Sequence, residues 1–318
     1  MNKGSRYKKK YKRDTINKKK VFAVLAIIII IFICIFKIIN RDKKENVDII
    51  SDNVNEENVV AEEVAVTIEP EEDAKIKSLI ENLILEKGLN NSNFWFFYYN
   101  KDLKKYYFYN QDTYFTAAST IKLPIAMLYY DKIRNGELTA ESTITYSSGC
   151  YEPGAGTTAY TYSVGSKVPI NFLLEQSIVN SDNTAVNILI KNLGYKNCKQ
   201  QISNYSLVEL PDEFYSKNIE NAQYAYDVVN HLYENINNYP ELIEDMKISS
   251  NGQYLKKYLQ DNDVAHKYGS YNGYVHDYGI VFGETNYLIG IFTKGIPNAD
   301  EFIADTSLKI INAVNENY

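Results

Sequence analysis

Apolar residues recur at helical spacing shortly after residue 72. Ile76, Ile80, Leu83 and Ile84 would share one face of a helix, and Gly88 stands where that helix should end. The sequence therefore predicts a first helix that stops at Gly88.

Short aromatic runs follow this helix. Residues 93–99 and 105–109 flank Asn100, Lys101 and Asp102, a pattern that is typical of a hairpin. The apolar period from about 119 to 260 is helical. Three more strands and a last helix are expected at 266–270, 275–282, 286–293 and 299–315.

This order of elements predicts an α/β fold of the α+β sandwich type, because strands separated in sequence can still pair in one sheet. We expect a five-stranded antiparallel sheet that is flanked by the terminal helices and carries an inserted helical subdomain. The predicted domain spans residues 73–318.

The segment before this domain has three parts of different character. Residues 21–39 are apolar except for Lys37, which is close to the length needed to span a bilayer, so we predict a single transmembrane helix there. Residues 1–20 carry ten Lys/Arg against one Asp, which places this tail in the cytoplasm and the rest of the chain outside it. Residues 40–72 carry eleven acids against three bases without a regular apolar period, as expected of a disordered linker.

Charge and residue composition argue against two classes of function, nucleic-acid binding and metal binding. The net charge is −6, and the excess of acids over bases in 73–318 argues against a nucleic-acid groove. The three cysteines and three histidines lack the spacing of metal sites, so we expect no metal. The glycine-rich string at 154–159 follows no predicted strand and opens no clear helix, so we expect no organic cofactor either. Cys150 and Cys198 could pair outside the membrane, and the sequence leaves that open.

The first candidate for chemistry is the Ser-x-x-Lys motif of Ser119 and Lys122, at the start of an apolar helix. Residues three apart lie on one helix face. A partly desolvated lysine loses its proton more easily, and it can then activate a neighbouring serine hydroxyl without a histidine. The same spacing occurs by chance at Ser5 and Lys8, so the motif alone is weak.

Two further motifs follow in the chain. Ser181-Asp182-Asn183 would place a hydroxyl and a carboxamide on a tight turn, although Ser181 could equally be a helix N-cap. Lys267 begins the run Lys-Tyr-Gly-Ser, on a predicted strand. A strand lysine followed by glycine can offer a cation to a carboxylate and an open backbone N–H to an oxyanion.

These three motifs, in this order and spacing, resemble the class A β-lactamase-like family of penicillin-recognising serine hydrolases. The resemblance covers about residues 73–318. It implies that Ser119 is the acylated nucleophile, that Lys122 is its base, and that Ser181 passes a proton to the leaving nitrogen with assistance from Lys267.

The resemblance also implies a set of substrate contacts. Asn183 would hold the side-chain amide of the substrate, and Lys267 would attract its carboxylate. Tyr268, Gly269 and Ser270 would line the substrate along the strand, and the N–H groups of Ser119 and Ser270 would form the oxyanion hole.

The sequence departs from the family pattern in two places. Tyr268 replaces the hydroxyl residue that usually stands between the lysine and the glycine, which puts a substrate-carboxylate contact in doubt. No Glu-x-x-Leu-Asn motif occurs between 184 and 266, where the class A enzymes carry the glutamate that activates the deacylating water. Glu209 and Glu213 are the weak candidates for that role.

We therefore expect a membrane-anchored, extracytoplasmic serine hydrolase that opens a β-lactam amide through acyl-Ser119 and deacylates slowly. Its expected partners are a β-lactam or a peptidoglycan peptide and, through residues 21–39, the cytoplasmic membrane. Two alternatives stay open. One is a D-alanyl-D-alanine peptidase, or penicillin-binding protein, that acts on cell-wall peptides. The other is a non-catalytic sensor of β-lactams or wall peptides.

Overall fold

The computed structural model describes residues 69–316 except 155, 250–252 and 260–262. The predicted tail at 1–20, the membrane span at 21–39 and almost all of the predicted linker lie outside the described residues. No helix within the described ranges is both long enough and apolar enough to cross a membrane.

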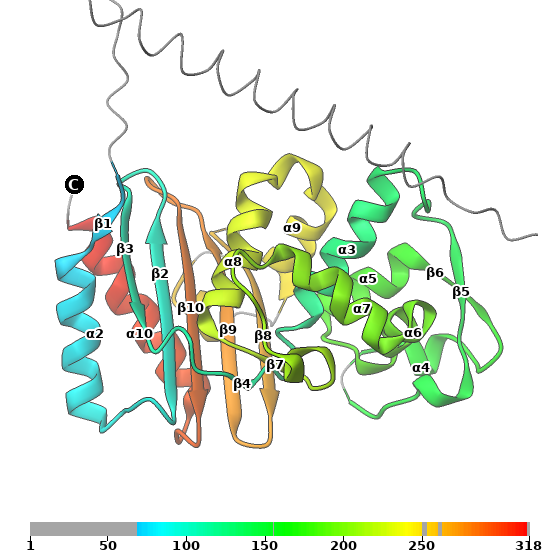
Figure 1. The fold of residues 1–318 in the computed structure, drawn as a ribbon, viewed down its shortest axis with the longest axis horizontal. Helices are drawn as coiled ribbons and strands as arrows, with labels where there is room; N and C mark the ends of the chain where they lie inside the picture. The colour runs from blue at the N-terminus through cyan, green and yellow to red at the C-terminus, as the bar shows by residue number, and fades with distance from the viewer. Residues whose placement is uncertain (1–68, 155, 250–252, 260–262, 317–318) are drawn as a thin grey trace, which may run out of the picture. The chain divides into compact units, whose positions relative to one another are not determined.

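One sheet of six strands forms the centre of the fold (Figure 1). In spatial order the strands are β1 (Glu71–Glu72), β3 (Lys105–Tyr109), β2 (Phe94–Asn100), β10 (Tyr287–Lys294), β9 (Tyr274–Val281) and β8 (Val264–Tyr271). The N-terminal hairpin joins the C-terminal strands where β2 pairs antiparallel with β10, with Phe97 opposite Gly290. The expected antiparallel pairing of the two strand groups is confirmed.

The strand count differs from the expectation of five. Glu71 and Glu72, which the sequence pattern assigns to the linker, form the short strand β1, and this strand pairs parallel with β3. The sequence pattern could not predict this strand, because two exposed acidic residues at a sheet edge show no alternation of apolar and polar positions.

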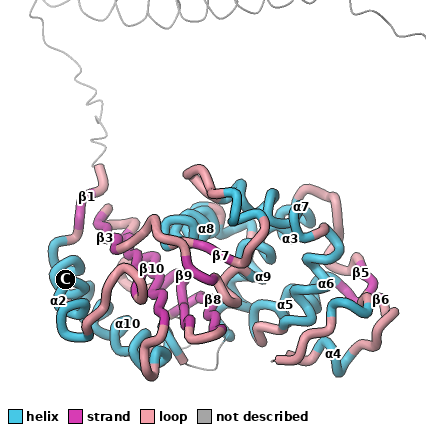
Figure 2. The backbone as a smooth tube through the Cα atoms, turned by 60° about the horizontal axis from the view of Figure 1, so that its bottom comes forward, coloured by secondary structure: helices cyan, strands magenta, loops and turns pink. Residues whose placement is uncertain are grey.

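Two helices, α2 (Ala74–Lys87) and α10 (Ala299–Asn315), cover one face of the sheet (Figures 1 and 2). Asp73 caps α2 by accepting hydrogen bonds from Lys75 N and Ile76 N. Gly88 ends α2 in the left-handed conformation, at φ 63°, which glycine adopts without a steric penalty. Both terminal helices were expected at these positions.

The other face of the sheet carries the helical part of the fold, which the sequence predicted as an insertion. Its helices are α3 (Lys122–Arg134), α4 (Thr158–Thr161), α5 (Ile170–Val179), α6 (Asn183–Leu193), α7 (Tyr195–Ile202), α8 (Ala222–Glu234) and α9 (Pro240–Ile248). Two small strand pairs brace it, β4 (Phe115–Thr116) with β7 (Ile219–Glu220), and β5 (Thr143–Thr145) with β6 (Lys167–Pro169). Short 3₁₀ turns occupy Ser148–Cys150, Ser203–Tyr205, Asp212–Tyr215, Ile236–Asn238 and Tyr254–Lys256.

Strand β2 shows why the sheet lies between two hydrophobic cores. Trp95 and Phe97 pack into the core shared with the helical part, whereas Phe94, Phe96 and Tyr98 pack into the core under α2 and α10. Alternate side chains of a strand point to opposite faces, so an almost wholly apolar strand must be covered on both sides. The aromatic run at 93–99 is explained by this double burial.

The cap of α2 gives a first prediction. We expect Asp73→Ala to lower the free energy of unfolding by about 1 kcal/mol, because two backbone N–H groups at the helix start lose their acceptor. A denaturant unfolding curve measures the change. Glu86→Ala, at an exposed position of the same helix, is the control and should stay within about 0.5 kcal/mol of the parent. Equal stability of the two variants would contradict the capping role.

Candidate active site

Ser119 lies in the turn between β4 and α3. Ala118 precedes it at a φ of 52°, and Lys122 N donates to Ser119 O at 3.2 Å, so the turn leads directly into the first residue of α3. Pro124 follows in the first turn of the helix, where a missing backbone N–H costs nothing. This local structure brings the Ser119 and Lys122 side chains to one cavity, with Ser119 in the turn before α3 rather than on the predicted common helix face.

A second layer of polar groups holds this turn from behind. Asn218 Nδ2 donates to Ala118 O at 2.9 Å, and the backbone carbonyl oxygen of Asn218 accepts from Ala117 N at 3.1 Å. The Thr120 hydroxyl lies 2.5 Å from Glu220 Oε1 and also contacts Ala117 O within hydrogen-bond distance. The Thr120 hydroxyl thus donates to both Glu220 Oε1 and Ala117 O, and it links Glu220 to the turn. Complete burial raises the pKa of Glu220 to about 8, which agrees with a neutral carboxyl.

Lys122 connects the first motif to the second. Its Nζ donates to Ser181 O at 2.5 Å, to Asn183 Oδ1 at 2.7 Å and to Ser181 Oγ at 3.2 Å. Burial lowers the pKa of Lys122 to about 8, against the opposing effects of the Asp182 and Glu152 carboxylates. A lysine in this state gives up a proton far more readily than one in water, which is the property that a base for Ser119 needs.

The second motif forms the turn that begins α6. Ser181 adopts a φ of 53°, and Asp182, rather than Ser181, is the N-cap, since Asp182 Oδ1 accepts from Ala185 N at 3.1 Å. The second carboxylate oxygen of Asp182 accepts from Thr158 N at 2.9 Å. The Ser181 hydroxyl is therefore left free of capping and faces the two lysines.

Lys267 approaches the same hydroxyl from strand β8. Its Nζ donates to Ser181 Oγ at 3.1 Å and to Tyr268 O at 2.7 Å, and the side chain is fully buried. Burial, reinforced by the nearby Lys122 cation, holds the pKa of Lys267 well below its usual value. All three motifs thus meet at the Ser181 hydroxyl, and the proton-transfer roles that the resemblance implies for them stay predictions.

Gly269 sets the distance between β8 and the turn of Ser119. A Cβ atom at position 269 would lie 2.7 Å from Ser119 N and 2.9 Å from Thr120 N, so only glycine permits this approach. Ser119 and Ser270 both line the cavity, while Gly269 forms the contact behind them. The role of their N–H groups as an oxyanion hole stays a prediction.

Tyr268 lies elsewhere than expected. Its ring stacks on Tyr254 with centroids 5.0 Å apart, and Lys267 Nζ stands 4.1 Å from the centroid of the Tyr268 ring. It is not among the residues that line the cavity. The bulk of Tyr268 is therefore accommodated beside Lys267, and the predicted substrate contact of Tyr268 remains a prediction.

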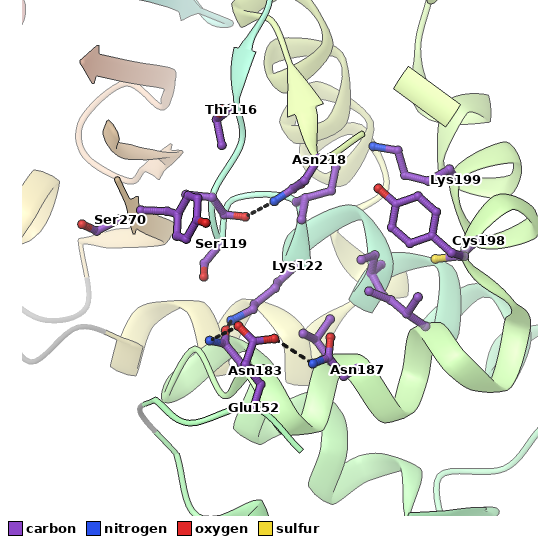
Figure 3. Close-up of a pocket in the computed structure, with 17 residues that line it drawn as sticks. Thr116, Ser119, Lys122, Glu152, Asn183, Asn187, Cys198, Lys199, Asn218 and Ser270 are labelled. Atoms are coloured by element: carbon purple, nitrogen blue, oxygen red, sulfur yellow. Dashed lines mark hydrogen bonds between the residues drawn. The ribbon is translucent and has the colours of Figure 1, made fainter. Parts of the chain in front are cut away.

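The cavity has a volume of about 410 Å³ and extends well beyond the predicted motifs (Figure 3). Sequence reasoning missed Glu152, whose two carboxylate oxygens accept from Asn183 Nδ2 at 3.0 Å and from Asn187 Nδ2 at 2.9 Å. It also missed Lys199 and Asn218. These residues lie on loops and on α7, where no motif or apolar period indicated a site.

The remaining candidates are two glutamates and two cysteines, of which only Cys198 lines the cavity. Glu209 and Glu213 are exposed and do not line it. Cys150 and Cys198 are buried free thiols, and Cys198 is part of the cavity wall. Within the described ranges, no cluster of His, Cys, Asp and Glu could hold a metal ion.

The close approach at Gly269 yields a second prediction. We expect Gly269→Ala to lower the free energy of unfolding by about 1–3 kcal/mol, because the added methyl group collides with backbone atoms that cannot rotate away. Gly283→Ala is the control, since its Cβ would meet Thr285 O at an ordinary 3.5 Å. Denaturant unfolding of both variants measures the difference, and an unchanged stability of Gly269→Ala would refute the contact.

Comparison with known proteins places this geometry in a family. The profile described as "Beta-lactamase enzyme family" matches residues 75–314. The solved structure of PBP-A is similar at a TM-score of 0.68 and 22% identity, over 78% of this chain and 99% of that one. A mutant of PBP-A, solved as an acyl-enzyme complex with penicillin G, has a TM-score of 0.69 at the same identity and coverage.

Structures described as β-lactamases are also similar. The β-lactamase from Sphaerobacter thermophilus DSM 20745 has a TM-score of 0.64 at 19% identity, over 76% of this chain and 96% of that one. The TLA-1 extended-spectrum β-lactamase has a TM-score of 0.65 at 19% identity, over 75% of this chain and 98% of that one. A search of curated proteins gives no match. The chain therefore belongs to the β-lactamase enzyme family and is a serine hydrolase.

Proposed function

We propose that this protein opens β-lactam amides through an acyl-Ser119 intermediate that is hydrolysed slowly. The observation that carries the proposal is the position of the Ser181 hydroxyl, which lies 3.2 Å from Lys122 Nζ and 3.1 Å from Lys267 Nζ beside a cavity that contains Ser119. Neutral Lys122 takes the proton of Ser119 as its oxygen attacks the lactam carbonyl. Ser181 then delivers a proton to the leaving nitrogen and is resupplied by a lysine.

The positions and hydrogen bonds of the acidic residues near the cavity support slow deacylation. Among the described residues that line it, Glu152 is the one acid, and both of its oxygens accept hydrogen bonds from asparagines. Glu209 and Glu213 are exposed elsewhere, and Glu220 lies behind the turn with its carboxyl engaged by Thr120. Among the described residues of the cavity wall, no carboxylate is without hydrogen-bond partners, and this supports slow activation of a water against the acyl-enzyme.

The location of the protein is part of the proposal. The basic residues at 1–20 and the apolar run at 21–39 support a single membrane anchor with the N-terminus in the cytoplasm. The catalytic domain would then work outside the cytoplasm, where cell-wall peptides and β-lactams are encountered.

A peptidase acting on D-alanyl-D-alanine is the second candidate, and the same shortage of water-activating acids favours it. Such an enzyme uses the same acyl chemistry on a different leaving group, and a long-lived β-lactam adduct would be its side reaction. Release of D-alanine from a wall-type pentapeptide, lost in Ser119→Ala, would identify this activity.

The proposal predicts a trapped covalent adduct. Benzylpenicillin mixed with the full chain in mild detergent should give a mass increase equal to one penicillin, because acylation outpaces hydrolysis. Intact-mass spectrometry over time measures the adduct, and Ser119→Ala should show none. Rapid turnover without any adduct would contradict slow deacylation, and the absence of both adduct and turnover would contradict the proposed function.

The pKa of Lys122 predicts how acylation depends on pH. The acylation rate should rise with pH and level off above about 8, because only neutral Lys122 accepts the proton. The Glu152 carboxylate raises this pKa, so Glu152→Gln should shift the rising limb to lower pH. The pH profile of adduct formation measures the shift. Exposed Glu213→Gln should leave the profile in place, and a shift of Glu152→Gln to higher pH would contradict Lys122 as the base.

A further inference from the structure

The cavity has a second region, away from the three motifs. We call it the inner pocket, and its walls come from α3, α6 and α7. Figure 3 shows Cys198 and Lys199 across the cavity from Ser119 and Ser270. The described residues that form it are Ile125, Val186, Ile190, Tyr195, Cys198 and Lys199.

Lys199 is the one charged side chain of the inner pocket, and it is 3% exposed. Within the described part of the chain, Lys199 Nζ has no hydrogen-bond partner, although it stands 3.6 Å from the centroid of the Phe214 ring. An aromatic face attracts a cation, but it does not replace the hydrogen bonds that a carboxylate oxygen would accept from the amine. A buried amine with unused donors is costly unless a ligand supplies the acceptor.

The neighbouring acid does not supply that acceptor. Glu220 raises the pKa of Lys199 electrostatically, but among the described residues its Oε1 accepts from Thr120 and its Oε2, like Lys199 Nζ, has no hydrogen-bond partner. Glu220 is also absent from the cavity wall. Lys199 is therefore a buried amine on the cavity wall whose N–H groups donate to none of the described residues, and they are available to a ligand in the cavity.

We propose that the inner pocket binds an acyl substituent of the substrate that has an aliphatic stem and a terminal carboxylate. The stem contacts the apolar walls, and the carboxylate accepts hydrogen bonds from Lys199 Nζ, which turns on its flexible stem from the Phe214 ring into the cavity. A cavity of about 410 Å³ is large enough for the lactam core and such a substituent. This inference rests on the proposed acylation of Ser119 and adds a substrate preference to it.

The test compares substrates that differ only in charge. Penicillins with glutaroyl, adipoyl and pimeloyl substituents are each paired with the terminal carboxamide of the same length. The acylation rate constant of the full chain in mild detergent is measured for all six. We expect the carboxylate to react at least about tenfold faster than its carboxamide at one or more lengths, because a charge-assisted hydrogen bond to a buried amine is strong.

Two lysine variants decide whether Lys199 is responsible. Lys199→Met keeps an aliphatic side chain and removes the charge, so it should abolish the preference for the carboxylates over their carboxamides. Lys196→Met, an exposed position on the same helix, should keep the preference. Thermal unfolding of each variant confirms that it folds. No preference in the parent at any length, or a preference that survives in Lys199→Met, overturns the inference.

A binding measurement separates this inference from the proposed function. Ser119→Ala cannot be acylated, so calorimetric titration with the same pairs of penicillins reports affinity alone. A preference for the carboxylates that disappears in Ser119→Ala/Lys199→Met supports the inner pocket even if the parent forms no adduct. Equal affinity for both members of every pair, or no binding of any of the six, refutes it.

Discussion

The Ser181 hydroxyl lies between two buried lysine amines, and the remainder of the site depends on keeping both of them there. Burying an ammonium group is costly, and burial lowers the pKa values of both Lys122 and Lys267; the nearby Lys122 cation lowers the pKa of Lys267 further. Stability alone would favour apolar residues at these positions. The two hydrophobic cores that flank the sheet hold this unfavourable arrangement in place. The two lysines can then exchange protons with the Ser181 hydroxyl.

The three motif segments meet because β8 touches the turn of Ser119. Ser119 and Lys122 come from the start of α3, Ser181 from the start of α6, and Lys267 from an edge strand of the sheet. Gly269 lets the strand backbone approach within contact distance of the turn, and the hydrogen bonds of Asn218 fix the turn from its other side. Distances between reacting groups are thereby set by backbone contacts, which vary far less than contacts between side chains.

The sequence pattern was sufficient for the elements with a strong period and for the motifs. The aromatic strand at 94–100, the helix that ends at Gly88 and the convergence of Lys122, Ser181 and Lys267 could all be anticipated. Glu152 and Lys199 could not be, because each reaches the cavity from a segment without a motif. Strand β1 and the stacking of Tyr268 on Tyr254 depend on long-range contacts that local propensity does not encode. The capping of α6 by Asp182 also needed the structure, since Ser181, Asp182 and Asn183 are all good caps.

The site is assembled from two regions of the fold, so a bound ligand affects how easily these regions open and are cleaved by proteases. The chain leaves the sheet before α3 and returns to it at β8, so the nucleophile and the strand opposite it belong to two regions, which also share a hydrophobic core. A ligand attached to Ser119 and held against Ser270 would add a further connection between the helical part and the sheet. A ligand that binds only the folded state stabilises that state. An occupied site should therefore make the protein more resistant to proteolysis and to local opening.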